Sequence, residues 1–158
     1  MHRIRWFPLG CLLAGGLICL PQAARCANAR LVKVLPHYTD LKGRVALNPS
    51  LYERDAYQAY LRKHPTERGG MQFDIQWKSP GLRQVVVRLE LRGNRGKLST
   101  TNTLTQTVSH HGLFGSWSKV TMTGEAFQKF GELSAWRATL WDGETQLAVQ
   151  ESFLWAPK

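Results

Sequence analysis

Hydrophobic and polar residues alternate strictly over 71–78, and this segment sets the pattern for most of the chain. Its odd positions, from Met71 to Trp77, are apolar, and its even positions are polar. Because successive side chains of a strand point to opposite faces of a sheet, this period of two predicts a strand with one buried face. A helix would spread the same apolar residues around its whole circumference.

Related patterns rich in β-forming residues recur along the chain. We expect further strands at 30–35, 85–92, 103–109, 117–123, 133–141 and 146–155. The first should be an edge strand that ends at Pro36, with a loop at 37–48 after it. The glycine-containing basic segment 93–97 is expected to be a flexible loop.

The dipeptide Asp142-Gly143 predicts a hairpin near the end of the chain. A two-residue turn there would place Ala138 opposite Leu147. The apolar faces of the two strands would then coincide.

One helix is expected over 51–63. Pro49, Ser50 and Glu53 form a capping-box pattern at its start, and His64-Pro65 ends it. The three-and-four spacing gives it one face made of Tyr52, Ala56, Ala59, Tyr60 and Lys63. We expect this face to cover an open edge or end of the strands.

Seven short strands without βαβ alternation predict a mainly β fold. The expected architecture is an antiparallel two-sheet immunoglobulin-like β-sandwich with one short helix inserted after the first strand. A small barrel is the alternative. A helical turn over 124–131 should carry the chain from one sheet to the other.

Residues 1–29 have the three-part pattern of a secretory signal peptide. Two arginines among the first five residues precede an apolar run at 10–20, and Ala27-Asn28-Ala29 offers a cleavage site. The apolar run is short for a membrane anchor, which is the alternative. We therefore expect export to the periplasm or the medium, membrane association only through the removed leader, and a single domain over 30–158.

Composition restricts the chemistry of the expected mature chain. Cys11, Cys19 and Cys26 all lie in the leader, so no disulfide or thiolate metal site is expected. Loss of the leader leaves 18 basic residues against 11 acidic ones, a net charge of +7. An exported basic surface favours a protein or an anionic polysaccharide or envelope component as partner, and no nucleic acid. No cofactor is expected.

An enzyme or metal-binding protein would have to bring His37, Asp40 and His110 together. Two imidazoles and a carboxylate could ligate a metal or perform acid–base chemistry. The chain contains no His-Glu-x-x-His, Gly-x-Ser-x-Gly or phosphate-loop motif. We therefore expect no catalytic residue and no metal site, with a small hydrolase or metal-binding protein as an alternative.

Five residues are candidates for binding. Trp141 has the opposite parity from the apolar residues of its strand, which predicts an outer-face position beside Arg137. An indole there could stack on a sugar ring or contact a partner. Arg92 and Arg95 belong to a basic run that could bind an acidic ligand, and Tyr57 marks the helix as a second candidate surface.

Four segments resemble a group of small exported bacterial proteins of unassigned function. These are Leu41-Lys42-Gly43-Arg44, 49–62, Phe130-Gly131-Glu132-Leu133 and Ala135-Trp136-Arg137. The resemblance implies no activity or ligand. The general shape is similar to immunoglobulin-like and fibronectin-III-like domains, without a cysteine pair, and such likeness does not give function. The expected function is a non-catalytic macromolecule-binding or structural module of the cell envelope, with a carbohydrate-binding or accessory module for polysaccharide as the alternative.

Overall fold

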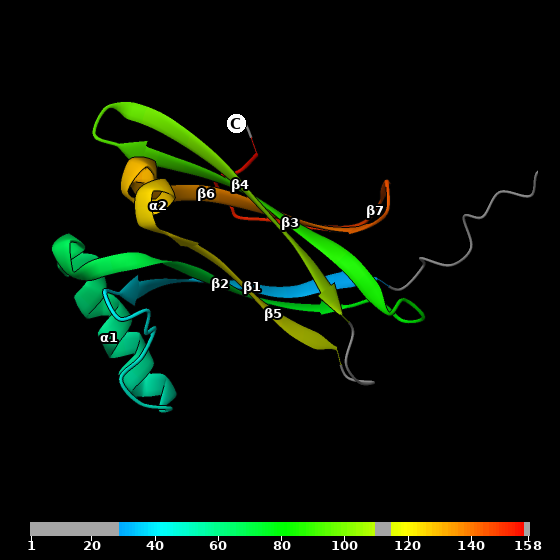
Figure 1. Cartoon of the computed structure of the whole chain (residues 1–158), viewed down its shortest axis with the longest axis horizontal. Helices are drawn as coiled ribbons and strands as arrows, with labels where there is room; N and C mark the ends of the chain where they lie inside the picture. Colours follow the sequence, from blue (N-terminus) through cyan, green and yellow to red (C-terminus); the bar gives the residue numbers. More distant parts are fainter. Residues whose placement is uncertain (1–28, 110–114, 157–158) are drawn as a thin grey trace, which may run out of the picture.

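The structure is a computed structural model, and it describes residues 29–109 and 115–156 of the 158-residue chain. Within these residues, seven strands and two α-helices follow one another along the chain (Figure 1). The elements are β1 (Arg30–Asp40), α1 (Leu51–Lys63), the 3-10 turn η1 (Pro65–Glu67), β2 (Arg68–Lys78), β3 (Gln84–Arg95), β4 (Leu98–Ser109), β5 (Ser116–Thr123), α2 (Gly124–Phe130), β6 (Glu132–Asp142) and β7 (Thr145–Glu151).

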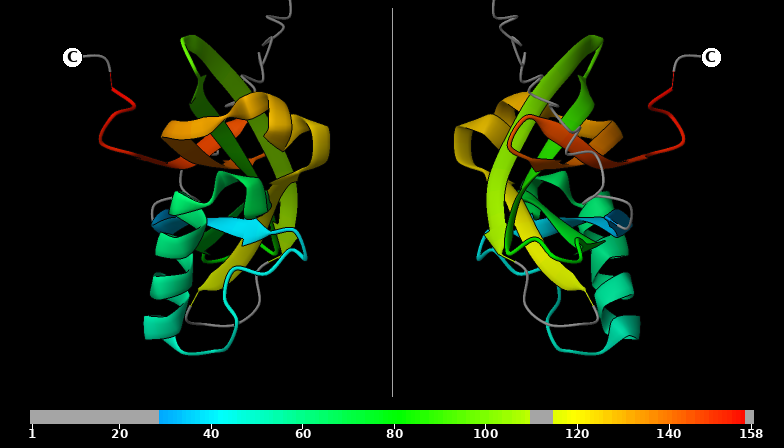
Figure 2. Two further views of the ribbon diagram at one scale, coloured as in Figure 1. Left: turned by 90° about the vertical axis from the view of Figure 1, so that its left-hand side faces the viewer. Right: turned by 90° about the vertical axis from the view of Figure 1, so that its right-hand side faces the viewer.

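All seven strands pair antiparallel, in two sheets. Sheet A has the strand order β1-β2-β5 and sheet B has the order β4-β3-β6-β7. The two sheets lie one above the other, and α2 carries the chain from sheet A to sheet B (Figures 1 and 2). The predicted mainly β, two-sheet antiparallel fold with a helix after the first strand is confirmed.

The core lies between the two sheets, and alternating residues of β2 and β3 form its centre. The side chains concerned are Met71, Phe73, Ile75, Trp77, Val85, Val87, Leu89 and Leu91, all of them buried. Burial of one such large apolar side chain stabilises the fold by about 1.5–3 kcal/mol. The period-two pattern therefore identified the main source of stability correctly.

The prediction that the first strand ends at Pro36 is wrong. β1 runs through Pro36 to Asp40, which removes the first part of the expected loop at 37–48. β1 is an edge strand that pairs only with β2, as expected. On the free edge of such a strand, the missing N–H of a proline costs no ladder hydrogen bond.

The expected flexible loop at 93–97 is largely strand. β3 continues to Arg95 and pairs with β4 from Leu98 onward, so that only 96–97 forms the turn. Gly96 adopts a positive φ of 63°, which residues with a side chain rarely take. Main-chain pairing therefore extends beyond the apolar alternation that predicted the strand.

The predicted register of the last hairpin is also wrong. Ala138 lies opposite Gln150 rather than Leu147. Two features cause the shift: the turn is centred on 143–144, and a β-bulge lies directly after Leu140. In a bulge, two residues of one strand lie opposite a single residue of its partner, so the pairing register changes beyond that point.

Candidate functional site

The outer face of sheet A is a grid of side chains whose rows are fixed by the strand register. The first row consists of Lys33, Gln76 and Trp117, the second of Leu35, Asp74 and Lys119, and the third of His37, Gln72 and Thr121. Neighbours within a row are about 5 Å apart, and successive rows are about 7 Å apart. The three rows place polar, charged and aromatic groups side by side.

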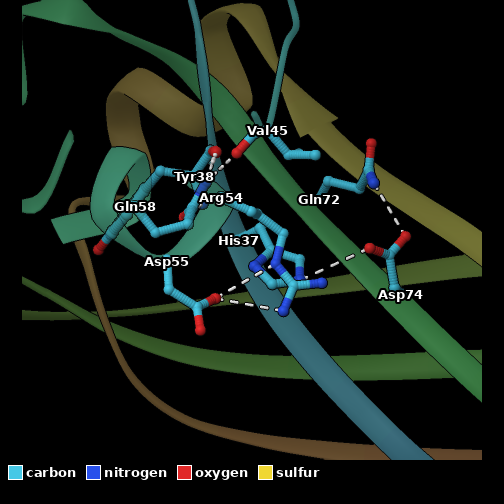
Figure 3. A network of polar contacts seen from close by, with 8 residues as sticks. All are labelled: His37, Tyr38, Val45, Arg54, Asp55, Gln58, Gln72 and Asp74. Carbon is cyan, nitrogen blue, oxygen red and sulfur yellow. Dashed lines mark hydrogen bonds and ion pairs between the residues drawn. The ribbon is translucent and has the colours of Figure 1, made fainter. Parts of the chain in front are cut away.

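Helix α1 lies on the side of sheet A that faces away from sheet B (Figures 1 and 2). Its residues Arg54, Asp55 and Gln58 surround His37 of the third row (Figure 3). His37 is only 9% exposed, whereas Trp117 of the first row is 54% exposed. The helix therefore covers one end of the grid and leaves the other end open.

The buried face of α1 differs from the predicted one. Tyr52 is 84% exposed, and the residues that turn inward are instead Arg54, Tyr57, Gln58 and Leu61. Their three-and-four spacing is that of a helix face. This face is mostly polar because the helix packs on the polar outer face of a sheet, so apolar content did not identify it. The helix bounds and the cap by Ser50, whose Oγ accepts from the N–H of Glu53 at 3.5 Å, agree with the prediction.

Gln58 joins the helix to the free edge of β1 (Figure 3). Its Oε1 accepts from the N–H of Tyr38 at 2.8 Å, and its Nε2 donates to the carbonyl oxygens of Tyr38 and Val45, each at 2.8 Å. The side-chain amide thus offers Tyr38 the donor and acceptor that a neighbouring strand would offer. Gln58 is 2% exposed, so these hydrogen bonds are shielded from water.

Asp40 holds the loop that leads from β1 to α1. Its carboxylate accepts from the main-chain N–H groups of Lys42 and Arg44, from the Arg44 guanidinium at 2.7 Å and from the Tyr57 hydroxyl at 2.8 Å. Burial alone would raise the pKa of Asp40, but these hydrogen bonds outweigh it and lower the pKa to about 2. Asp40 and Tyr57 therefore form a structural tie.

His37 faces Asp74 rather than Asp40. Its Nε2 lies 3.6 Å from Oδ2 of Asp74, and Oδ1 of Asp74 accepts from Nε2 of Gln72 at 2.8 Å (Figure 3). Burial lowers the pKa of His37, and the nearby Asp74 carboxylate only partly opposes this. The imidazole is therefore neutral at pH 7. His110, the third residue that the alternative enzyme or metal site would need, lies outside the described residues.

A groove opens where α1 ends its cover of the grid. We use the name "the groove" for a hollow of about 270 Å³ lined by Leu35, Arg54, Asp74, Trp117 and Lys119. Arg54 forms one wall, and its guanidinium bonds Oδ1 of Asp55 at 3.2 Å. The floor comes from the first and second rows. The groove thus combines an exposed indole, two cations and a carboxylate.

A second hollow, of about 380 Å³, lies between α1, the edge of β1 and the start of β6. The Tyr38 hydroxyl donates to Glu132 at 2.7 Å, and Arg68 both pairs with Glu132 and stacks over the Tyr38 ring at 4.0 Å. Burial, followed by the hydrogen bond to Glu132, raises the pKa of Tyr38 to about 12. The polar side chains that line this hollow are bonded to one another. This favours a structural role for them over the binding of a ligand.

Two of the predicted binding residues, Arg92 and Arg137, lie together on the outer face of sheet B. Each of their guanidinium groups stacks on the ring of Trp155, at distances of 4.0 Å for Arg92 and 4.9 Å for Arg137. Arg137 also forms an ion pair with Glu90. The chain after β7 therefore turns back and packs on this face, so these two arginines bind the protein's own C-terminal segment.

The remaining predicted binding residues are dispersed. Trp141 is half-buried on the outer face of sheet B, with Arg88 stacked on its ring at 4.9 Å and its Nε1 donating to Thr139 at 2.8 Å. Arg95 is exposed at the far end of β3. Tyr57 belongs to the tie with Asp40 on the other side of the molecule.

The exposed tryptophan that sequence reasoning missed is Trp117. The sequence contained a signal for it, because Trp117 has the opposite parity from Val120 and Met122, which are the buried apolar residues of the same strand. The same parity argument that placed Trp141 on an outer face applies to Trp117. The parity of one strand does not reveal the groove, because α1 and two other strands also contribute residues to its lining.

Comparison with models of protein families, with curated proteins and with solved structures gives no match. Within residues 29–109 and 115–156, no three His, Cys, Asp or Glu side chains are grouped so that they could hold a metal ion. In the same part of the chain, no helix has the length and hydropathy to cross a membrane. The functional evidence is therefore the chemistry of the groove.

Proposed function

We propose that this chain is an exported, non-catalytic binding domain of the cell envelope that holds a macromolecular partner in the groove on sheet A. The observation that carries the proposal is the position of Trp117, a half-exposed indole at the margin of a hollow with charged walls. Aromatic residues beside fixed polar groups are where binding energy concentrates in recognition sites.

The side chains around the groove favour the binding of a partner over catalysis. Asp40, the acid that the sequence suggested for catalysis, is fully engaged by Arg44 and Tyr57. His37 is buried and neutral, and its nearest carboxylate, Asp74, also accepts from Gln72. These contacts fix side chains in place, which is a property of a preorganised binding site.

The leader and the basic charge support an envelope location in the periplasm or outside the cell. Residues 1–29 have the pattern of a signal peptide, and the net charge of +7 that remains would attract anionic partners. We also assign the domain to the immunoglobulin-like sandwiches. Its strand order departs from the seven-strand constant type only in the fourth strand, which pairs with β3 instead of β5.

Co-sedimentation with isolated cell-wall sacculi and with washed membrane envelopes tests the proposal. The full chain is expressed, and the purified protein is mixed with each fraction alongside Trp117→Ala and the matched control Trp141→Ala. Unmodified protein and Trp141→Ala should pellet with one of the fractions, and Trp117→Ala should pellet about tenfold less, as expected for loss of a contact worth about 1.4 kcal/mol. Equal pelleting of all three proteins, or none by any, would refute binding through the groove.

A further inference from the structure

We infer that the ligand of the groove is a polysaccharide that carries carboxylates, such as a uronic acid polymer. In this assignment Trp117 stacks on a sugar ring, and Lys119 and Lys33 bind the carboxylates. The inference rests on the proposed function, because it names the ligand class of the same site.

The surroundings of Trp117 favour a sugar ring over an apolar protein side chain. Its neighbours in the grid are Gln76 in its own row and Lys119 in the next, and only Leu35 on the groove floor is apolar. A pyranose has C–H groups on its face and hydroxyls around its rim. An indole face ringed by amide, ammonium and carboxylate groups is complementary to that distribution.

The charge on the open rows favours an acidic ligand. Lys33 and Lys119 are both exposed, and neither forms an ion pair with any residue that the structure describes. From strand spacing and rise, these two positions are about 12 Å apart across the grid. Two separated ammonium groups along one sheet face suit a polymer with repeated carboxylates. Asp74 is the single acidic side chain among the residues that line the groove.

The position of Asp74 explains why Lys119 keeps its charge free for a ligand. The two residues are direct cross-strand partners, which is where an ion pair would be expected. Instead, the Asp74 carboxylate accepts from Gln72 and faces His37, both in the third row. The carboxylate is thus held toward the covered end of the grid.

Asp74 also distinguishes an acidic ligand from a neutral one. A carboxylated glycan is repelled by Asp74, so Asp74→Asn should bind it more tightly. A neutral glycan would use the Asp74 carboxylate as an acceptor for its hydroxyls, so the same substitution should weaken its binding. The sign of this effect therefore reports the ligand class.

Titration calorimetry of the full chain, purified after expression, with an oligogalacturonide tests the inference. A neutral dextran oligosaccharide and polyglutamate are the matched probes, one with sugar rings and no charge, the other with carboxylates and no rings. The oligogalacturonide should bind best, and Trp117→Ala should weaken it about tenfold, equivalent to about 1.4 kcal/mol. Trp117→Phe should keep most of the affinity, Lys119→Gln should weaken binding and flatten its salt dependence, and Trp141→Ala should change nothing.

Several results would overturn the inference. One is binding of polyglutamate as tight as that of the oligogalacturonide and unaffected by Trp117→Ala, which indicates charge attraction alone. Another is preference for dextran together with weaker binding by Asp74→Asn, which indicates a neutral glycan. If Trp117-dependent pelleting with envelope fractions persists while no saccharide binds, the ligand class is wrong and the proposed function stands. If both the pelleting and the saccharide binding are absent, both proposals fail.

Discussion

Replacing Gln58 with methionine tests how α1 is held on sheet A. The two side chains are similar in length and volume, so the change removes three hydrogen bonds and little packing. It leaves the N–H and C=O of Tyr38 and the C=O of Val45 without their partner. At about 1 kcal/mol for each buried hydrogen bond, the expected loss of unfolding free energy is about 3 kcal/mol. This loss cannot exceed the free energy needed to detach α1 from sheet A. Once the helix is detached, water can form hydrogen bonds with these main-chain groups.

Urea unfolding and amide hydrogen exchange measure this effect together. The unfolding midpoint should fall, and the Tyr38 amide should exchange much faster than in the unmodified protein. Gln128→Met, at an exposed position of α2, is the matched control and should change the free energy of unfolding by less than about 0.5 kcal/mol. A Gln58→Met protein that loses under about 1 kcal/mol and keeps a slowly exchanging Tyr38 amide would refute the reasoning, because three shielded hydrogen bonds could not then be supporting this edge.

Four further predictions concern other parts of the chain. Since the pKa of Asp40 falls from its ordinary 3.8 to about 2 on folding, the folded state should lose about 1–2 kcal/mol as the pH falls from about 4 to about 2, and urea unfolding of Asp40→Asn should lack this loss. The pKa of Tyr38 near 12 favours its neutral form in the folded state, so ultraviolet titration should show a late-ionising tyrosine, and stability should fall between about pH 10 and about pH 12. Trp155→Ala should cost roughly 2 kcal/mol in thermal or urea unfolding, whereas substitution of the exposed Phe153 should have little effect. Exported protein should begin at Arg30 when its N-terminus is sequenced, and an N-terminus at Met1 would contradict cleavage.

The parts of the fold that depend on apolar alternation could be predicted from the sequence. In β2 and β3, each odd residue from Met71 to Trp77 and from Val85 to Leu91 is buried between the sheets. The alternation is clear because one face of each strand is buried between the sheets, whereas the other face points outward. The two-sheet architecture was predicted from the number of such strands and from the turns between them.

The features that depend on main-chain hydrogen bonds could not be predicted in the same way. The bulge after Leu140 and the continuation of β1 through Pro36 leave no mark in the apolar pattern. The buried face of α1 was missed for a related reason, since Gln58 is buried by hydrogen bonding to Tyr38 and not by its own hydrophobicity. Polar burial is visible only once the partner strand is in place.

The candidate site shows the same division. Parity predicted an outer-face position for Trp141, and it would have done so for Trp117. Sequence alone did not show that Trp141 has Arg88 stacked on it while Trp117 borders a groove. The alternative enzyme or metal-binding function would have needed His37 beside Asp40, but the Asp40 carboxylate bonds Arg44 and Tyr57, whereas His37 faces Asp74.

The free edge of β1, which is an edge strand of sheet A, also bears on self-association. An exposed edge is a template on which a second molecule can add a strand. Here Pro36 has no N–H to offer a newcomer, and both main-chain groups of Tyr38 are already bonded to Gln58. Addition of a strand to sheet A is therefore opposed at two successive outward-facing positions of β1, and one glutamine both anchors a helix and occupies the main-chain groups of that edge.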